Sequence, residues 1–166
     1  MNIKIYMERI IGLLILLTSL NSCLSVAKMS DFSKTASTID FDKYSTEYHE
    51  KKEPFWSGQT SNEYYFEKGQ TITEKKLTDI IQYALKQKGY SIKGIDNEND
   101  YVIGKRGMYA NEWSSITGVY YKLDNNQERL QIYINTKITQ DFTGGWGENR
   151  AKKVGQIIEK LIDTNK

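Results

Sequence analysis

Residues 71–104 read TITEKKLTDIIQYALKQKGYSIKGIDNENDYVIG, and the period of their apolar residues changes within this segment. The apolar residues between positions 77 and 85 fall at i, i+3, i+4, i+7 and i+8, which is the spacing of a helix with one apolar face. Thr71 and Glu74 have the spacing of a capping box at the start of this helix. Gly89 follows at the position where glycine commonly ends a helix. We therefore expect one amphipathic helix that ends at Gly89.

Strands are predicted on both sides of this helix. The expected strands are residues 63–68, 90–93, 101–104, a part of 113–123, and 129–139. The last of these is the strongest, because its apolar residues alternate with polar ones and so lie on one face. A second amphipathic helix is expected from about Glu148 to Asp163.

The predicted order of elements is β-α-β-β-β-β-α. Consecutive strands joined by short turns form an antiparallel sheet, and two amphipathic helices are the natural cover for one face of it. We therefore expect an α+β fold with a sheet of four to five strands and both helices on one face. Residues 61–166 would form this single domain.

Composition limits the chemistry that the chain can carry. Hydrophobic residues make up 39% and charged residues 27% of the 166 residues, which allows a packed core. The single cysteine excludes an internal disulfide framework and a cysteine-rich zinc site. The single histidine, His49, leaves little material for histidine-based catalysis. A formal charge of +2 gives no reason to expect nucleic acid as a partner.

The N-terminus has the pattern of an export signal. A short charged opening precedes an apolar run from Ile10 to Leu20. Eleven helical residues span only about 16 Å, roughly half of the ~30 Å hydrocarbon core of a membrane. This length is typical of a secretory signal peptide rather than of a membrane-spanning helix. The segment Leu20-Asn21-Ser22-Cys23 then resembles a bacterial lipobox, the leucine–x–small–cysteine signal of lipoproteins.

This resemblance covers only the first 23 residues and implies a lipid anchor. Cys23 would be diacylated on its sulfur, and the chain would be cut after Ser22, so that residues 1–22 are the signal peptide. Leu24, which is not an aspartate, implies the outer membrane rather than the inner membrane in enteric-type sorting. The alternative is that Cys23 is an incidental thiol in an uncleaved N-terminal helix.

Residues 23–60 show little periodicity and are expected to be a lipid-anchored polar tether followed by a docking arm. Ser25 to Thr38 is rich in polar residues and predicts a flexible tether. Aromatic residues after Ile39 indicate that the later part packs against the domain.

Three further features could belong to a site, and each also has an ordinary structural interpretation. The polar segment 96–100 has oxygen ligands at alternate positions, but a hairpin turn of Asp and Asn needs no metal. The loop Gly144–Gly147 before a helix could bind an anion, although it matches no phosphate-binding motif. His49 stands alone in a charged segment and is expected at the surface. We expect no metal and no cofactor.

Aromatic side chains supply the remaining candidate site. Tyr120, Tyr121 and Tyr133 are expected partly opposite the aliphatic side of their strands, and with Trp146 they form a candidate surface for a protein or a glycan. The same residues could equally pack in the core or under the docking arm.

These observations favour a bacterial cell-envelope lipoprotein that faces the periplasm. The expected function is that of a membrane-tethered, non-catalytic binding or scaffolding module with an envelope protein or glycan as its partner. The alternative is a periplasmic enzyme of hydrolytic type, using the loop Gly144–Gly147 with Asp141 and Glu148.

Overall fold

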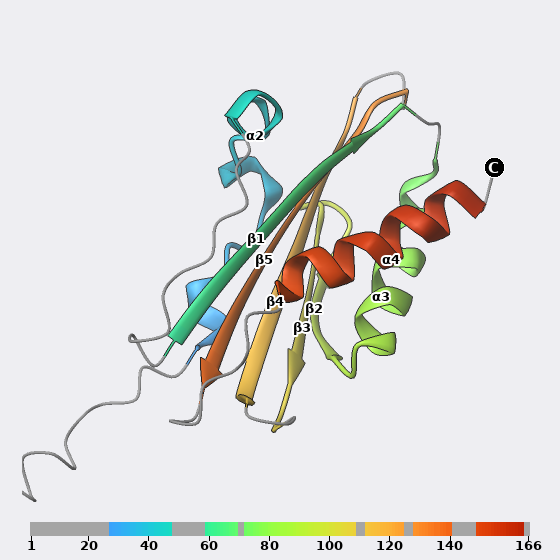
Figure 1. Cartoon of the computed structure of the whole chain (residues 1–166). Helices are drawn as coiled ribbons and strands as arrows, with labels where there is room; N and C mark the ends of the chain where they lie inside the picture. Colours follow the sequence, from blue (N-terminus) through green and yellow to red (C-terminus); the bar gives the residue numbers. More distant parts are fainter. Residues whose placement is uncertain are drawn as a thin grey trace, which may run out of the picture.

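The computed structural model describes residues 27–47, 59–69, 72–108, 112–124, 128–140 and 149–164. An N-terminal arm is followed by five strands and two long helices (Figure 1). The elements in chain order are η1 (Met29–Asp31), η2 (Ala36–Thr38), α2 (Phe41–Glu47), β1 (Gln59–Lys68), α3 (Glu74–Gln87), β2 (Ser91–Asp96), β3 (Tyr101–Arg106), β4 (Glu112–Leu123), β5 (Leu130–Gln140) and α4 (Arg150–Thr164).

The five strands form one antiparallel sheet in the order β1-β5-β4-β3-β2. Strands β2 to β5 are a meander, and β1 closes the sheet beside β5. Both α3 and α4 lie on one face of the sheet (Figure 1). The predicted α+β class is confirmed, and the N-terminal arm adds elements to the predicted order.

Helix α3 forms where the apolar spacing predicts it, but its start differs from the prediction. The N-cap is Thr73, whose Oγ1 accepts a hydrogen bond of 3.4 Å from the Lys76 N–H. Thr71, the cap predicted from the sequence, lies outside the described residues. The predicted end is confirmed, because Gly89 has a φ of +79°, which favours glycine. The Arg106 guanidinium donates to the Lys88 carbonyl at 3.1 Å and so caps the last turn.

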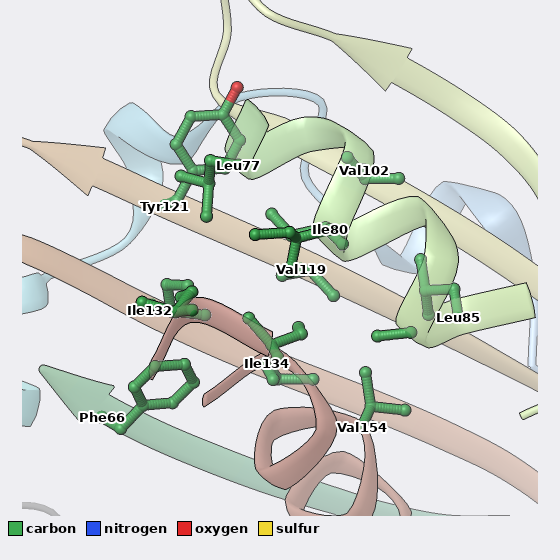
Figure 2. Close-up of a cluster of buried hydrophobic side chains, with 14 of the residues drawn as sticks. Phe66, Leu77, Ile80, Leu85, Val102, Val119, Tyr121, Ile132, Ile134 and Val154 are labelled. Atoms are coloured by element: carbon green, nitrogen blue, oxygen red, sulfur yellow. The ribbon is translucent and has the colours of Figure 1, made fainter. Parts of the chain in front are cut away.

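The main core lies between the sheet and the two helices. Figure 2 shows side chains of α3 and α4 facing Val119, Ile132 and Ile134 of the central strands. These strand residues are buried, as are the inward residues of both helices. The alternation that predicted the strand at 129–139 therefore describes the side of β5 that the helices cover.

The opposite face of the sheet is covered by the N-terminal arm, residues 27–47 (Figure 1). Its apolar side chains pack with tyrosines and isoleucines of β1, β3, β4 and β5 in a second buried cluster. Phe32 lies over Gly118, where an added Cβ would be 2.9 Å from the Phe32 ring. The Ala27 N–H donates to Thr139 Oγ1 at 2.8 Å, and the Ala36 N–H donates to the Asn99 carbonyl at 2.8 Å.

The position of the arm shows that the prediction of a flexible tether was wrong for its described residues. Ser25 to Thr38 was expected to be a flexible tether, yet Ala27, Phe32 and Ala36 are buried against the sheet. Tyr44 supports the other prediction, that the later part docks, because it packs with the same cluster. Three layers therefore result: two helices, the sheet, and the arm.

Candidate functional site

The three tyrosines proposed as a contact surface are buried. Tyr120, Tyr121 and Tyr133 have exposed fractions of 2%, 0% and 4%. Tyr121 faces the helices and lies beside Leu77 (Figure 2), whereas Tyr120 and Tyr133 lie under the arm. The structure therefore has the alternative arrangement, in which these tyrosines pack in the core and under the arm. Tyr120 and Tyr121 lie on opposite faces of the sheet because neighbouring residues of a strand point to opposite faces.

The tyrosine cluster under the arm has the character of a packed interior. The Tyr120 hydroxyl donates to the Ser33 carbonyl at 2.9 Å, and the Tyr44 and Tyr133 ring centroids are 4.4 Å apart. Burial raises the pKa of Tyr120 and of Tyr133 above the ordinary value for tyrosine, and it raises the pKa of Tyr121 to about 12. These phenols are therefore neutral at physiological pH, and Tyr120 and Tyr133 join the arm to the sheet.

Several predicted site residues lie outside the described residues. These are Cys23, His49, and the loop segment 141–148, which includes Trp146 and both carboxylates of the enzyme alternative. Among the described residues, no group of three or more His, Cys, Asp or Glu side chains could hold a metal ion. Within the same residues, no helix is long and apolar enough to cross a membrane.

The acidic turn between β2 and β3 borders a small pocket of about 310 Å³. The arm forms one wall of this pocket, and Glu98, Asn99 and Asp100 form part of the other. Asp96 accepts hydrogen bonds from the backbone and the side chain of Asn99, which closes the turn from within. Burial, followed by the charges of Glu74 and Asp96, raises the pKa of Asp100. The turn is thus held by its own hydrogen bonds, as its sequence suggests.

A larger groove of about 460 Å³ runs between the outer faces of α3 and α4. It is lined by amines, amides and apolar side chains, namely Tyr83, Gln87, Lys88, Lys153, Gln156, Ile157, Lys160 and Leu161. No carboxylate is among these lining residues, so the formal charge of the lining is positive. Tyr83 is 52% exposed, and Gln87 donates a hydrogen bond of 2.7 Å to its hydroxyl.

This groove was missed by sequence reasoning for a physical reason. Its lysines and Tyr83 lie on the outward sides of two amphipathic helices, where polar residues are expected in any case. The one available signal was the position of Ile157 beside the apolar face of α4. Only the packing of α3 against α4, which the sequence does not specify, brings these residues to one place.

The chemistry of the groove is that of binding. Amines hold carboxylates or phosphates, amides offer both donors and acceptors, and the apolar side chains provide area that gains from burial. The groove lining holds no paired carboxylates and no nucleophile with a base beside it. No protein-family model matches this chain, and a search of curated proteins returns no match.

Proposed function

We propose that this chain is a cell-envelope lipoprotein, anchored by a lipid on Cys23, whose domain is a non-catalytic binding module. The groove between α3 and α4 is its binding surface. The observation that carries this proposal is the combination, in one exposed groove, of three lysines with apolar side chains and no carboxylate. Such a surface is complementary to an envelope protein segment that places acidic residues next to apolar ones.

The rigid setting of the groove supports this assignment. Helix α3 is capped at both ends and helix α4 packs against β1, β5 and α3. A groove between two fixed helices needs little reorganisation on binding, which favours affinity. The lipobox-like segment Leu20 to Cys23 supports the anchor and the envelope location. Leu24 favours the outer membrane.

The binding surface is tested by photo-crosslinking in the expressing bacterium. A photoreactive phenylalanine analogue replaces Tyr83, and crosslinked products are identified by mass. We expect a discrete protein partner whose yield falls by about tenfold when Lys88→Glu and Lys160→Glu are combined, because charge reversal removes complementarity. The matched control is Lys75→Glu with Lys122→Glu, which lie outside the groove lining and should leave the yield unchanged. Equal loss in both pairs would contradict the groove assignment.

The anchor is tested by the intact mass of protein extracted from membranes, beside a Cys23→Ser variant. We expect loss of residues 1–22 together with the mass of acyl chains, and neither change in the variant. Retention of residues 1–22 without acylation would overturn the lipoprotein assignment. Cleavage without acylation would indicate a secreted protein instead.

A further inference from the structure

One end of the sheet is also the end at which the N-terminal chain enters. Ala27 is held by Thr139, one residue before the end of β5. Thr139 pairs with Gln59 at the start of β1, and Glu112 at the start of β4 pairs with Gln140. The start of β2, the end of β3 and the last turn of α3 lie at this end as well (Figure 1). We call it the anchor end.

The exposed side chains described at the anchor end include three lysines and one large apolar residue. Lys28 follows Ala27, Lys86 is in the last turn of α3, and Lys105 is at the end of β3. All three lysines are exposed. Met108, just beyond β3, is 77% exposed, the highest value among the large hydrophobic residues of the described chain.

One carboxylate near this end is already engaged. Asp31 accepts a hydrogen bond of 3.0 Å from the Lys28 N–H, and it lies 3.9 Å from Lys137 Nζ. It therefore cancels little of the charge of the exposed lysines.

The opposite end of the sheet has more acidic residues than lysines, although Lys75, Lys76 and Lys122 lie there as well. The β2–β3 turn carries Asp96, Glu98 and Asp100, and the β4–β5 hairpin carries Asp124 and Glu128. The raised pKa of Asp100, caused by burial and then by Glu74 and Asp96, agrees with a concentration of negative charge there. The near-neutral total charge of the chain thus conceals a polarity along the strands.

The length of chain before Ala27 places the anchor end near the membrane. Cys23 is only four residues before Ala27, and the apolar run from Ile10 to Leu20 ends three residues before Cys23. Four extended residues reach about 14 Å at most. With the arm docked, the domain therefore has no long tether that would lift it away from the surface.

We propose that the anchor end binds the headgroups of anionic phospholipids in the membrane that holds the N-terminus, with Lys28, Lys86 and Lys105 contacting the phosphates and Met108 entering the interface. This inference rests on the membrane attachment in the proposed function. It leaves the opposite, more acidic end directed away from the membrane. Acidic residues are repelled by an anionic surface, so the same polarity fixes the orientation of the domain.

The test measures the distance of each end from the membrane in the full chain. A fluorescent coumarin amino acid replaces Met108 or, as the matched control, Glu128. The protein is reconstituted in vesicles of phosphatidylethanolamine and phosphatidylglycerol that contain a lipid with a nitroxide quencher on its headgroup. Strand β5 alone has 11 residues and spans about 37 Å. We therefore expect loss of most of the fluorescence at position 108 and no loss at position 128.

The role of charge is tested in the same assay. Replacing Lys28, Lys86 and Lys105 by Gln together should reduce contact of the anchor end by up to about a hundredfold, since each lysine near an anionic surface contributes a factor of about five. The control is the triple Gln variant of Lys75, Lys76 and Lys122 at the other end, which should leave quenching unchanged. Vesicles of phosphatidylcholine alone should also reduce quenching at position 108.

The outcomes separate this inference from the anchor itself. Quenching at position 108 supports the inference whether the chain is acylated on Cys23 or retains residues 1–22. The intact mass shows which of these two forms attaches the protein to the membrane. An acylated chain with no quenching at 108, or with equal quenching at both ends, overturns the inference and leaves the lipid anchor standing. Quenching at 108 that does not respond to the lysine variant or to neutral lipid overturns the assignment to anionic headgroups. A chain that is not bound to vesicles at all contradicts both proposals.

Discussion

Gly155 lies in α4 at the place where this helix crosses Tyr64 of β1. A Cβ at position 155 would overlap the Tyr64 ring and lie 3.2 Å from Ile134 Cδ1. The ring has little freedom to move aside, because the Tyr64 hydroxyl donates to Glu159 at 2.7 Å. Two effects of Gly155→Ala therefore oppose each other: helix propensity favours Ala by about 1 kcal/mol, and overpacking costs about 1–3 kcal/mol.

We expect the clash to outweigh the propensity at this position. Gly155→Ala should lower the free energy of unfolding by up to about 2 kcal/mol, measured by chemical denaturation. Gly107→Ala is the control, since a Cβ there has nothing within 4 Å. An unchanged or raised stability for Gly155→Ala would mean that α4 can shift away from β1 at little cost.

Asp100 offers a prediction with a definite pH dependence. Its folded-state pKa is raised, first by burial and then by Glu74 and Asp96. A carboxyl group with a raised pKa lowers stability progressively as the pH rises from its unfolded pKa of about 4, and the loss is complete above its folded-state pKa. Asp100→Asn should therefore raise stability at pH 7, and the pH-dependent part of the gain should vanish below about pH 4.

The backbone at this position suits the substitution. Asp100 has a φ of +55°, a conformation that Asn tolerates as well as Asp does. Thermal unfolding at a series of pH values measures the effect, with Asp79→Asn on the exposed side of α3 as the control. A gain of equal size for Asp100→Asn at pH 3 and pH 7 would exclude an electrostatic cause.

At the scale of elements, the arm and the helices cover separate faces and share no core residue. Phe32 is the residue of the arm that packs against Gly118, and Lys137 Nζ lies 5.9 Å from its ring centroid. Removing a buried phenyl ring costs about 3 kcal/mol or more. Phe32→Ala should therefore open the arm about a hundredfold more often, while α3 and α4 keep their packing.

Amide hydrogen exchange measures this opening at two reporters within the arm. The N–H groups of Ala27 and Ala36, which are bonded to β5 and to the β2–β3 turn, should exchange about a hundredfold faster. The amide of Leu77 in α3 should be unaffected. Ser37→Ala, at an exposed position of the arm, is the control. Equal acceleration in α3 would show that the arm and the domain unfold as one unit.

The sequence predicts most clearly the helices and strands whose apolar residues recur at a regular spacing. The spacing between Leu77 and Leu85 and the alternation through 129–139 depend only on local geometry, and both elements form where expected. The arm has no such period, because its buried residues Ala27, Phe32 and Ala36 are separated by polar ones. Its docking depends on the sheet face beneath it, which a local pattern cannot describe.

The candidate site was harder to predict for a related reason. Strand alternation places Tyr120 and Tyr121 on opposite faces, so the two could not share one surface. The face that the helices leave open is covered by the arm, so neither face is exposed at these tyrosines. The groove of Lys88 and Lys160 required the relative placement of two helices that are separated by four strands in the chain.

At the scale of the whole molecule, the docked arm would determine how far the domain can move from the lipid anchor that we propose on Cys23. With the arm in place, Ala27, the first residue bonded to the sheet, is four positions after Cys23 in the sequence. Gln59, where β1 begins, is 36 positions after Cys23 in the sequence. A flexible chain of that length has a root-mean-square extension of about 33 Å and a contour length of about 120 Å. Under the proposed membrane attachment, we therefore expect arm docking and membrane contact to be coupled.

The last prediction tests this coupling. Phe32→Asp combined with Phe41→Asp places two charges in the buried cluster under the arm and should release it. In the headgroup-quenching assay, the probe at position 108 should then lose most of its quenching while the mass of the membrane anchor is retained. Ser37→Asp with Thr38→Asp, at exposed arm positions, adds the same charge and should keep the quenching. If quenching persists although the amides of the arm exchange freely, the lysines alone hold the domain at the membrane, and the arm does not set its height.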